Sequence, residues 1–128
     1  MTSVEVPYSI AAALPTLSVI DITNDVSREV STSGCPDGIA FIRANDELAV
    51  VRVQERETGF FEDIEGMLER IVPSDAGSRE RLVTMLLGSR TEQVPFMDGA
   101  LCLGQWQRLL LFSLAAEHRA DWSITLVG

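Results

Sequence analysis

Four segments of the chain carry the apolar patterns expected of β-strands. Residues 109–114 are a continuous apolar run, which is typical of a strand buried on both faces. Residues 122–127 alternate Trp, Ile and Leu with Ser, Thr and Val, which predicts a strand with one buried face. Residues 39–44 and 49–54 are mostly apolar and flank the polar stretch 45–47, so they are predicted to be two strands joined by a turn.

Weaker strand patterns lie near the N-terminus and in the second half of the chain. Residues 4–14 favour β-structure, but Pro7 and Pro15 interrupt the pattern, which predicts a bent edge strand. Residues 18–22 are expected to be the next strand. Residues 89–103 alternate short apolar groups with turn residues, which predicts further strands there.

Three segments have helical periodicity. The strongest pattern runs over residues 59–72, where apolar residues recur at helical spacing and acidic residues fill the opposite face. A second helix is predicted over residues 79–87, between Ser78 as its N-cap and Gly88 at its end. A short helix is expected to begin with Thr23 as its N-cap.

The predicted elements follow one another in the order ββαββααβββ. Helices do not alternate regularly with strands in this order, so the fold class is predicted to be α+β. We expect a mixed, mainly antiparallel β-sheet packed by two to three helices. The chain has 128 residues, a length that suits one domain over residues 1–128.

Charge restricts the partners that the chain is expected to bind. The sequence has 19 acidic and 10 basic residues, all of the latter arginine, and a formal net charge of −9. A surface of this sign repels nucleic-acid phosphates and anionic lipids, so we expect neither nucleic acid nor membrane as a partner. The start of the chain lacks the basic and apolar pattern of a signal peptide, which favours a cytoplasmic location.

Histidine and cysteine supply little recognisable chemistry. His118 is the only histidine and falls in a predicted surface turn, where a solvated side chain is the favoured interpretation. Cys35 and Cys102 are the only cysteines, and two distant thiols with one histidine make neither a disulfide framework nor a zinc site. Cys102 lies between two leucines and is expected to be a small core residue.

Acidic residues concentrate between positions 46 and 69 and allow two interpretations. They either form a carboxylate site for a hard cation such as Mg²⁺ or Ca²⁺, or they make up a solvated helix face and its loops. The second interpretation is favoured, and we expect no metal and no cofactor. Glu55 is the exception, because it follows a buried strand just before a helix, where it either caps that helix or has a functional role.

A tryptophan lies beside an amide and a guanidinium at Trp106, Gln107 and Arg108. These groups together are able to line a ligand pocket. The commoner alternative is a packed tryptophan whose indole N–H has a partner, and this alternative is favoured.

Several short motifs together resemble the YjbQ family, small proteins associated with a secondary thiamine-phosphate synthase activity. The most specific are Leu-Leu-Gly-Ser at residues 86–89 and Leu-Gly-Gln-Trp-Gln at residues 103–107. Further matches are Val-Pro at 94–95, Asp-Gly at 98–99 and Ile-Asp-Ile-Thr at 20–23. The resemblance runs from about Val19 to Gly128, and it implies an α+β fold and a homotrimer.

The chain departs from the family pattern at its histidines. Where the family carries histidine in a His-Thr-(Ser/Thr)-Ala motif, this chain has Asp46, and the family's Asn-Glu-Asn is Gln54-Glu55-Arg56. The family loop with further histidines is shortened here to residues 74–81 and contains none. Because a carboxylate of ordinary pKa does not replace imidazole in metal binding or proton transfer, we expect the histidine-dependent activity to be absent.

Three functions remain open at this point. The chain is expected to be a divergent YjbQ-like protein that acts as an oligomeric small-ligand-binding or assembly module. Alternatively it is an altered transferase of the thiamine-phosphate synthase-like family acting on a phosphorylated metabolite, or an acidic structural partner of another protein. The candidate pocket comprises Asp46, Glu55, Trp106, Gln107 and Arg108. In the transferase alternative, Arg43, Arg52 or Arg108 is the group that holds the phosphate.

Overall fold

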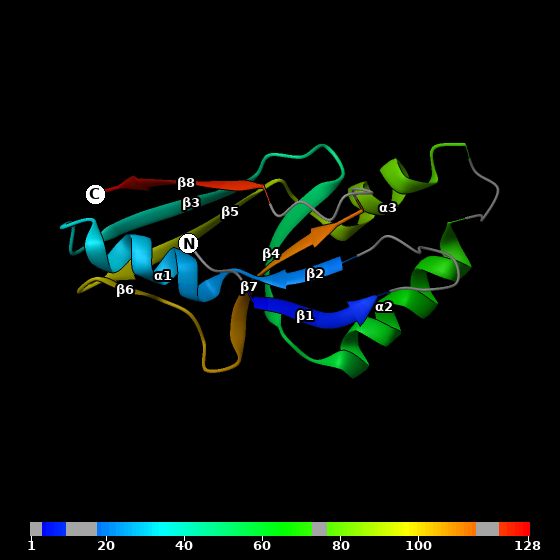
Figure 1. Ribbon diagram of the computed structural model, residues 1–128, viewed down its shortest axis with the longest axis horizontal. Coiled ribbons are helices and arrows are strands. Elements are labelled where there is room, and N and C mark those ends of the chain that lie inside the picture. Colours follow the sequence, from blue (N-terminus) through cyan, green and yellow to red (C-terminus); the bar gives the residue numbers. More distant parts are fainter. Residues whose placement is uncertain (1–3, 10–17, 73–76, 115–120) are drawn as a thin grey trace.

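A computed structural model of the chain describes residues 4–9, 18–72, 77–114 and 121–128 (Figure 1). These residues form two four-stranded sheets and three helices. Every strand pair in this part of the chain is antiparallel. The first sheet has the order β1-β2-β7-β4, and the second has the order β6-β5-β3-β8.

The first sheet is built around its most apolar strand. Its members in spatial order are β1 (Val4–Ser9), β2 (Ser18–Asp21), β7 (Gln107–Ser113) and β4 (Ala49–Glu55). Leu110 and Phe112 of β7 join one core cluster, whereas Leu109 and Leu111 join the other. This alternation confirms the prediction that the apolar run at 109–114 is buried on both faces.

The second sheet has one buried face. Its members in spatial order are β6 (Ala100–Leu101), β5 (Thr91–Met97), β3 (Gly38–Ala44) and β8 (Trp122–Val127). Ala40, Ile42 and Val94 point inward and are buried, while their sequence neighbours on the same strands point outward.

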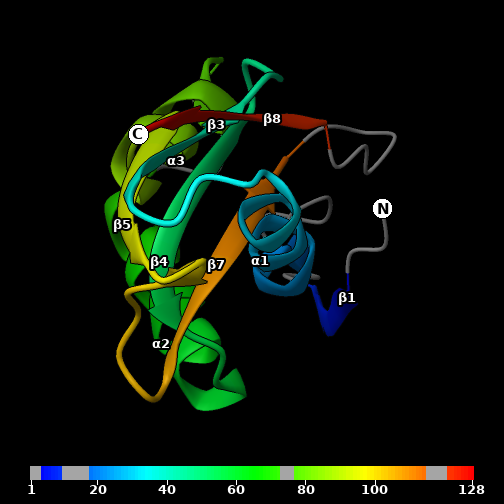
Figure 2. The same ribbon diagram turned by 90° about the vertical axis from the view of Figure 1, so that its left-hand side faces the viewer.

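The three helices lie at the two ends of the molecule, one at one end and two at the other. Helix α1 (Thr23–Thr32) packs beside β6 and β7, as Figure 2 shows, and contributes the buried Val26 and Val30. Helices α2 (Thr58–Ile71) and α3 (Arg79–Leu87) lie together at the other end (Figure 1). They cover the outer face of the first sheet, where their apolar side chains meet Val50, Leu110 and Phe112.

Glu57 explains where α2 begins. Its carboxylate accepts hydrogen bonds from the backbone N–H groups of Gly59 and Phe60, each at 2.9 Å. These donors have no partner within the helix, so the side chain satisfies two of the groups that every helix N-terminus leaves free. The predicted helix over 59–72 is therefore confirmed to within one residue at each end.

The two sheets meet at the outer edge of β4. The backbone N–H of Val51 donates to the carbonyl oxygen of Ser89 at 3.0 Å. Two residues further along, the N–H of Val53 donates to the Glu92 carboxylate, also at 3.0 Å. The edge strand β4 of the first sheet is thus hydrogen-bonded to residues 89–92, which lead into β5 of the second sheet.

The structure confirms the α+β class and refines its details. The strands divide into two sheets where one was expected, and the described pairs are all antiparallel where a mixed sheet was expected. The observed order is ββαββααββββ, because the short β6 adds a strand to the predicted three at the C-terminal end. None of the helices in the described ranges has the length and apolar character needed to cross a membrane.

Two local predictions need correction, and two others fall outside the described residues. Thr23 is the first residue of α1 and Ile22 occupies the N-cap position. The Thr23 hydroxyl does not cap the helix, because it donates to Asp21 and accepts from the Leu109 N–H. Cys102 is exposed, since the strand-like alternation turns Leu101 and Leu103 toward the core and Cys102 away from it. The second half of the predicted 4–14 strand and the turn with His118 lie outside the described residues.

Candidate functional site

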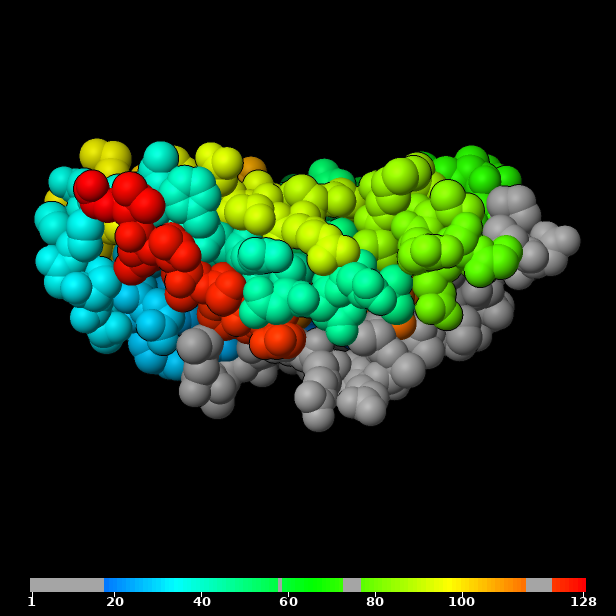
Figure 3. Space-filling view, turned by 90° about the horizontal axis from the view of Figure 1, so that it is seen from above, coloured from blue at the N-terminus to red at the C-terminus, as the bar shows by residue number. Residues whose placement is uncertain are grey.

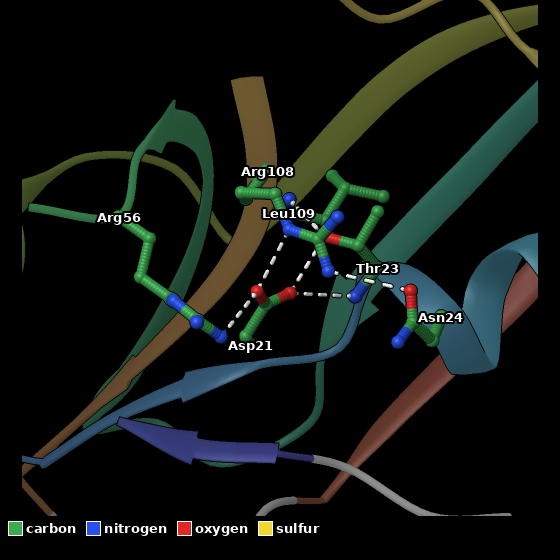
Figure 4. A network of polar contacts seen from close by, with 6 residues as sticks. All are labelled: Asp21, Thr23, Asn24, Arg56, Arg108 and Leu109. Carbon is green, nitrogen blue, oxygen red and sulfur yellow. Dashed lines mark hydrogen bonds and ion pairs between the residues drawn. The ribbon is translucent and has the colours of Figure 1, made fainter. Parts of the chain in front are cut away.

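A buried carboxylate lies at the junction of β2 and α1. Asp21 is 2% exposed, and its Oδ1 accepts hydrogen bonds from the backbone N–H of Thr23 at 3.0 Å and from the Thr23 hydroxyl at 2.6 Å (Figure 4). The same hydroxyl oxygen accepts from the Leu109 N–H at 2.8 Å. Thr23 therefore holds Asp21 in one orientation and is itself anchored to Leu109 of β7.

The second oxygen of Asp21 faces two arginines. Its Oδ2 accepts from Arg108 Nε at 2.8 Å and from Arg56 Nη1 at 3.3 Å. Figure 4 shows the two guanidinium groups approaching the carboxylate from separate segments of the chain. Arg108 is near the start of β7 and Arg56 directly follows β4, and these strand ends are neighbours in the first sheet.

The electrostatics favour the ionised form of Asp21. Burial alone raises the pKa of this carboxyl group, but hydrogen bonds from Arg108 and Thr23 outweigh burial and hold the pKa below its usual value. The side chains of Arg108 and Arg56 remain 33% and 45% exposed, so both guanidinium groups also face solvent. One buried negative charge thus orients two accessible positive charges.

A tight turn presents Trp106 beside these arginines. Within residues 104–107, the Gln107 N–H donates to the Gly104 carbonyl at 3.0 Å, and the Gly104 N–H donates to Gln107 Oε1 at 2.7 Å. Trp106 stands at the tip of this turn and is 69% exposed. The favoured expectation of a packed tryptophan is therefore wrong, because the turn directs the indole away from the core.

The arginines and the tryptophan border a shallow depression of about 510 Å³. It is lined by Asn24, Arg56, Gln105, Trp106 and Arg108. Arg108 Nη2 also donates to Asn24 Oδ1 at 3.3 Å, so the side of the depression near α1 is tied to the arginine. The Asp21–Arg56–Arg108 group has a net charge of +1 in a chain whose formal net charge is −9.

The structure brings together part of the predicted pocket. Trp106 and Arg108 line the depression, and Gln107 closes the turn between them. Glu55 is paired with Gln107 across β4 and β7 and is exposed. Four of the five candidate residues therefore lie at the same end of the first sheet.

Asp46 lies apart from the other candidates. It precedes β4, and its Oδ1 accepts from the Leu48 N–H at 2.8 Å, which is a local turn contact. Glu55 is at the far end of the same strand, so the length of β4 separates the two carboxylates by about 20 Å. Asp46 and Glu55 do not converge on a shared cleft.

The acidic stretch is dispersed in the same way. Among the described residues, no group of three or more His, Cys, Asp or Glu side chains is placed to hold a metal ion. Glu62, Asp63 and Glu69 are exposed on α2. Within the described ranges, the arrangement favours the interpretation of a solvated helix face.

Comparison with known proteins identifies the family. The family model described as UPF0047 protein YjbQ-like matches residues 14–128. The chain belongs to the YjbQ family. A UPF0047 protein of Methanothermobacter thermautotrophicus is 29% identical to this YjbQ chain over 121 residues, covering 88% of the chain and 84% of that protein. A UPF0047 protein of Archaeoglobus fulgidus is 32% identical over 103 residues, covering 73% of the chain and 79% of that protein.

Solved structures share the YjbQ fold. An uncharacterized conserved protein of the YjbQ/UPF0047 family from Clostridium acetobutylicum superposes with a TM-score of 0.78 at 21% identity, covering 99% of this chain and all (100%) of that one. A protein of unknown function from Sulfolobus solfataricus gives 0.76 at 23% identity, with 99% and 95% coverage. At these identities the likeness establishes the fold alone.

Four residues of the site are not among the candidates that the sequence predicts, namely Asp21, Asn24, Arg56 and Gln105. Asp21 lies in the Ile-Asp-Ile-Thr motif, where an acidic residue ends an apolar strand and a hydroxyl residue follows two positions later. That spacing suits a carboxylate that accepts from the backbone at i+2, which was a usable signal. The contribution of Arg56 depends on the pairing of β4 with β7, for which the sequence carries no local signal.

Proposed function

We propose that this YjbQ-family protein is a binding module for a small phosphorylated ligand. The observation that carries the proposal is the pair of accessible arginines, Arg56 and Arg108, held by the buried carboxylate of Asp21. Guanidinium groups are planar, permanently charged donors that match the geometry of phosphate oxygens. Holding both groups in place before binding lowers the entropy lost when an anion is bound.

Trp106 extends the proposal to the rest of the ligand. Its exposed ring borders the same depression as the two arginines and offers a flat apolar surface. A ligand with a planar ring next to its phosphate makes use of both features, through stacking on the indole and ion pairing with the guanidinium groups. Asn24 and Gln105 supply further hydrogen-bonding groups at the rim.

A binding role fits the residues better than the family's histidine-dependent activity. The chain has a single histidine, His118, and the candidate site consists of arginine, amide, tryptophan and one carboxylate of lowered pKa. A carboxylate that stays ionised is a poor proton donor near neutral pH. We therefore expect the gene to fail to complement a strain that lacks thiamine-phosphate synthase, and robust growth would contradict this part of the proposal.

The binding proposal is tested by fluorescence titration. Thiamine monophosphate, which carries a ring and a phosphate, is expected to bind and quench Trp106, while thiamine and inorganic phosphate each bind at least about tenfold more weakly. Arg108→Gln is expected to weaken binding of thiamine monophosphate by about tenfold or more. Arg90→Gln, on a distant part of the surface, is the matched control.

Each control addresses a separate outcome. Trp122 also fluoresces, so Trp106→Phe is used to assign the signal. Equal binding of thiamine and thiamine monophosphate would contradict a phosphate site. An unchanged affinity in both Arg108→Gln and Arg56→Gln would show that the ligand binds elsewhere.

Self-assembly is a second candidate, favoured by the outward face of the second sheet. Pro95, Ile39 and Val127 are neighbours across β5, β3 and β8, and all three are exposed. Met97, one step further on this face of β5, is also exposed. Figure 3 shows these three strands side by side on the surface. A contiguous apolar row of this kind is typical of an interface, which supports the homotrimer expected from the family resemblance.

A further inference from the structure

A groove separates α2 from α3 on the outer face of the first sheet. Its volume is about 270 Å³. The walls are apolar and comprise Phe60, Ile64 and Met67 of α2, Leu86 of α3 and Phe112 of β7. The groove shares no lining residue with the depression beside Trp106, so it is a separate site.

The sequence of β4 explains why the groove exists. Val50 points toward the two helices and is buried in the core, and the next two residues on the same strand face are Arg52 and Gln54. These polar side chains are unsuited to a closed apolar core, so this end of the sheet is left open between the helices. Polar groups therefore lie at one side of an otherwise apolar groove.

Arg52 is fixed at the edge of the groove. Its Nη1 donates to the carbonyl oxygen of Leu87, at the end of α3, at 2.6 Å. Gly88 makes room for it, because a Cβ at that position would lie 3.1 Å from Arg52 Cδ. This is the single hydrogen bond of the guanidinium within the described residues, so most of its five donors are available to a ligand.

Asp63 places the opposite charge at the same groove. It projects from α2, and no described residue forms a hydrogen bond or ion pair with its carboxylate. Arg52 and Asp63 both line the groove without forming a salt bridge to each other. A positive and a negative group are thus both free to pair with charges of a bound molecule.

We propose that this groove binds a free amino acid with a large apolar side chain. The carboxylate of the ligand pairs with Arg52, its ammonium group pairs with Asp63, and its side chain lies between Phe60, Ile64 and Phe112. A cavity of about 150 Å³ holds one benzene molecule, so the volume of the groove suits a single ring. Because such a zwitterion has no net charge, the acidic surface of the protein does not repel it.

The test is a titration of the isotope-labelled full chain, followed by backbone amide NMR. L-phenylalanine is expected to give saturable shifts at α2 and at the end of α3. 3-Phenylpropionate lacks the ammonium group and phenethylamine lacks the carboxylate, and each is expected to bind about tenfold more weakly. Absence of saturable shifts with L-phenylalanine, or equal binding of 3-phenylpropionate, would overturn the proposal.

Two substitutions separate the charge contacts from general effects on folding. Asp63 lies on an exposed helix face. Asp63→Asn is expected to weaken the binding of L-phenylalanine and phenethylamine by about tenfold and to leave the binding of 3-phenylpropionate unchanged. Arg52→Gln is expected to weaken the binding of L-phenylalanine and 3-phenylpropionate and to leave the binding of phenethylamine unchanged. Arg70→Gln, elsewhere on α2, is the control. Equal loss for all three compounds, or a groove closed by a second copy of the chain, would contradict amino-acid binding.

Discussion

The two sheets of this protein differ in what covers them. The first sheet is packed on one face by α2 and α3 and on the other by the second sheet and α1, so Leu110 and Leu111 are both buried although they point in opposite directions. The second sheet is buried on one face, and its other face exposes Ile39 and Val127. Apolar residues thus build the core in the first sheet, whereas on the open face of the second they are available for association.

The largest expected effect on stability comes from a substitution at the centre of the first sheet. Leu111→Ala removes a fully buried side chain in a strand with no solvent face, and we expect it to lower the free energy of unfolding by about 2–5 kcal/mol. Ile39→Ala, on the exposed face of the second sheet, is expected to change it by less than about 0.5 kcal/mol. Urea denaturation measures both, and similar losses would contradict the contrast between the sheets.

The next effect comes from Asp21, at the end of the inner strand β2 of the first sheet. Asp21→Asn removes the charge that pairs with both arginines. It is expected to lower the free energy of unfolding by about 1.5–3 kcal/mol at neutral pH. Because folding lowers the pKa of Asp21, its ionised form stabilises the fold above about pH 4, and this contribution is lost as the pH falls through the lowered pKa.

Denaturation at a series of pH values tests this dependence. The difference in unfolding free energy between Asp21→Asn and the unmodified chain should be largest near neutrality and should shrink in acid. Glu62→Gln, on the exposed face of α2, is the control. A difference that stays constant from pH 7 to below about pH 3 would show that the charge of Asp21 is not what stabilises the site.

A smaller effect is expected where α2 begins to cover the first sheet. Glu57→Ala removes the acceptor for two backbone N–H groups and is expected to lower the free energy of unfolding by about 1 kcal/mol. Glu57→Asp, which keeps a carboxylate at this position, should recover part of the loss. Thermal denaturation measures the difference, and an unchanged midpoint in Glu57→Ala would show that the cap contributes nothing.

The smallest effect on stability is expected on the open face of the second sheet. Ile39→Glu places a charge in the exposed apolar row and should leave the unfolding free energy of the isolated monomer nearly unchanged. If this face is the interface of a homotrimer, the same substitution converts the trimer to monomers in sedimentation velocity, while Thr91→Glu on the polar end of the face does not. A chain that is monomeric without any substitution would contradict self-assembly.

Much of the fold is predictable because its main signals are local. The run at 109–114 and the alternation at 122–127 predict their strands and even the number of buried faces. The division into two sheets is not local, since it depends on which strands pair. Cys102 shows the limit of reasoning from neighbours, because the leucines on either side of it face the core while it faces solvent.

The candidate site was predictable only in part. Trp106, Gln107 and Arg108 are adjacent in sequence, so a single motif identifies them. Asp21 and Arg108 are 87 positions apart and meet only because β2 pairs with β7. Asp46 and Glu55 are close in sequence but lie at opposite ends of an extended strand, so their proximity along the chain was misleading.

The hydrogen bonds at the outer edge of β4 affect how readily the protein aggregates at high concentration. A strand that ends a sheet normally offers free amide groups to which a strand of another molecule is able to add, and this is a common start of fibril growth. Here the amides of Val51 and Val53 already donate to Ser89 and Glu92. An incoming strand would find those positions occupied, so the chain blocks cross-molecular strand addition along this edge by its own contacts.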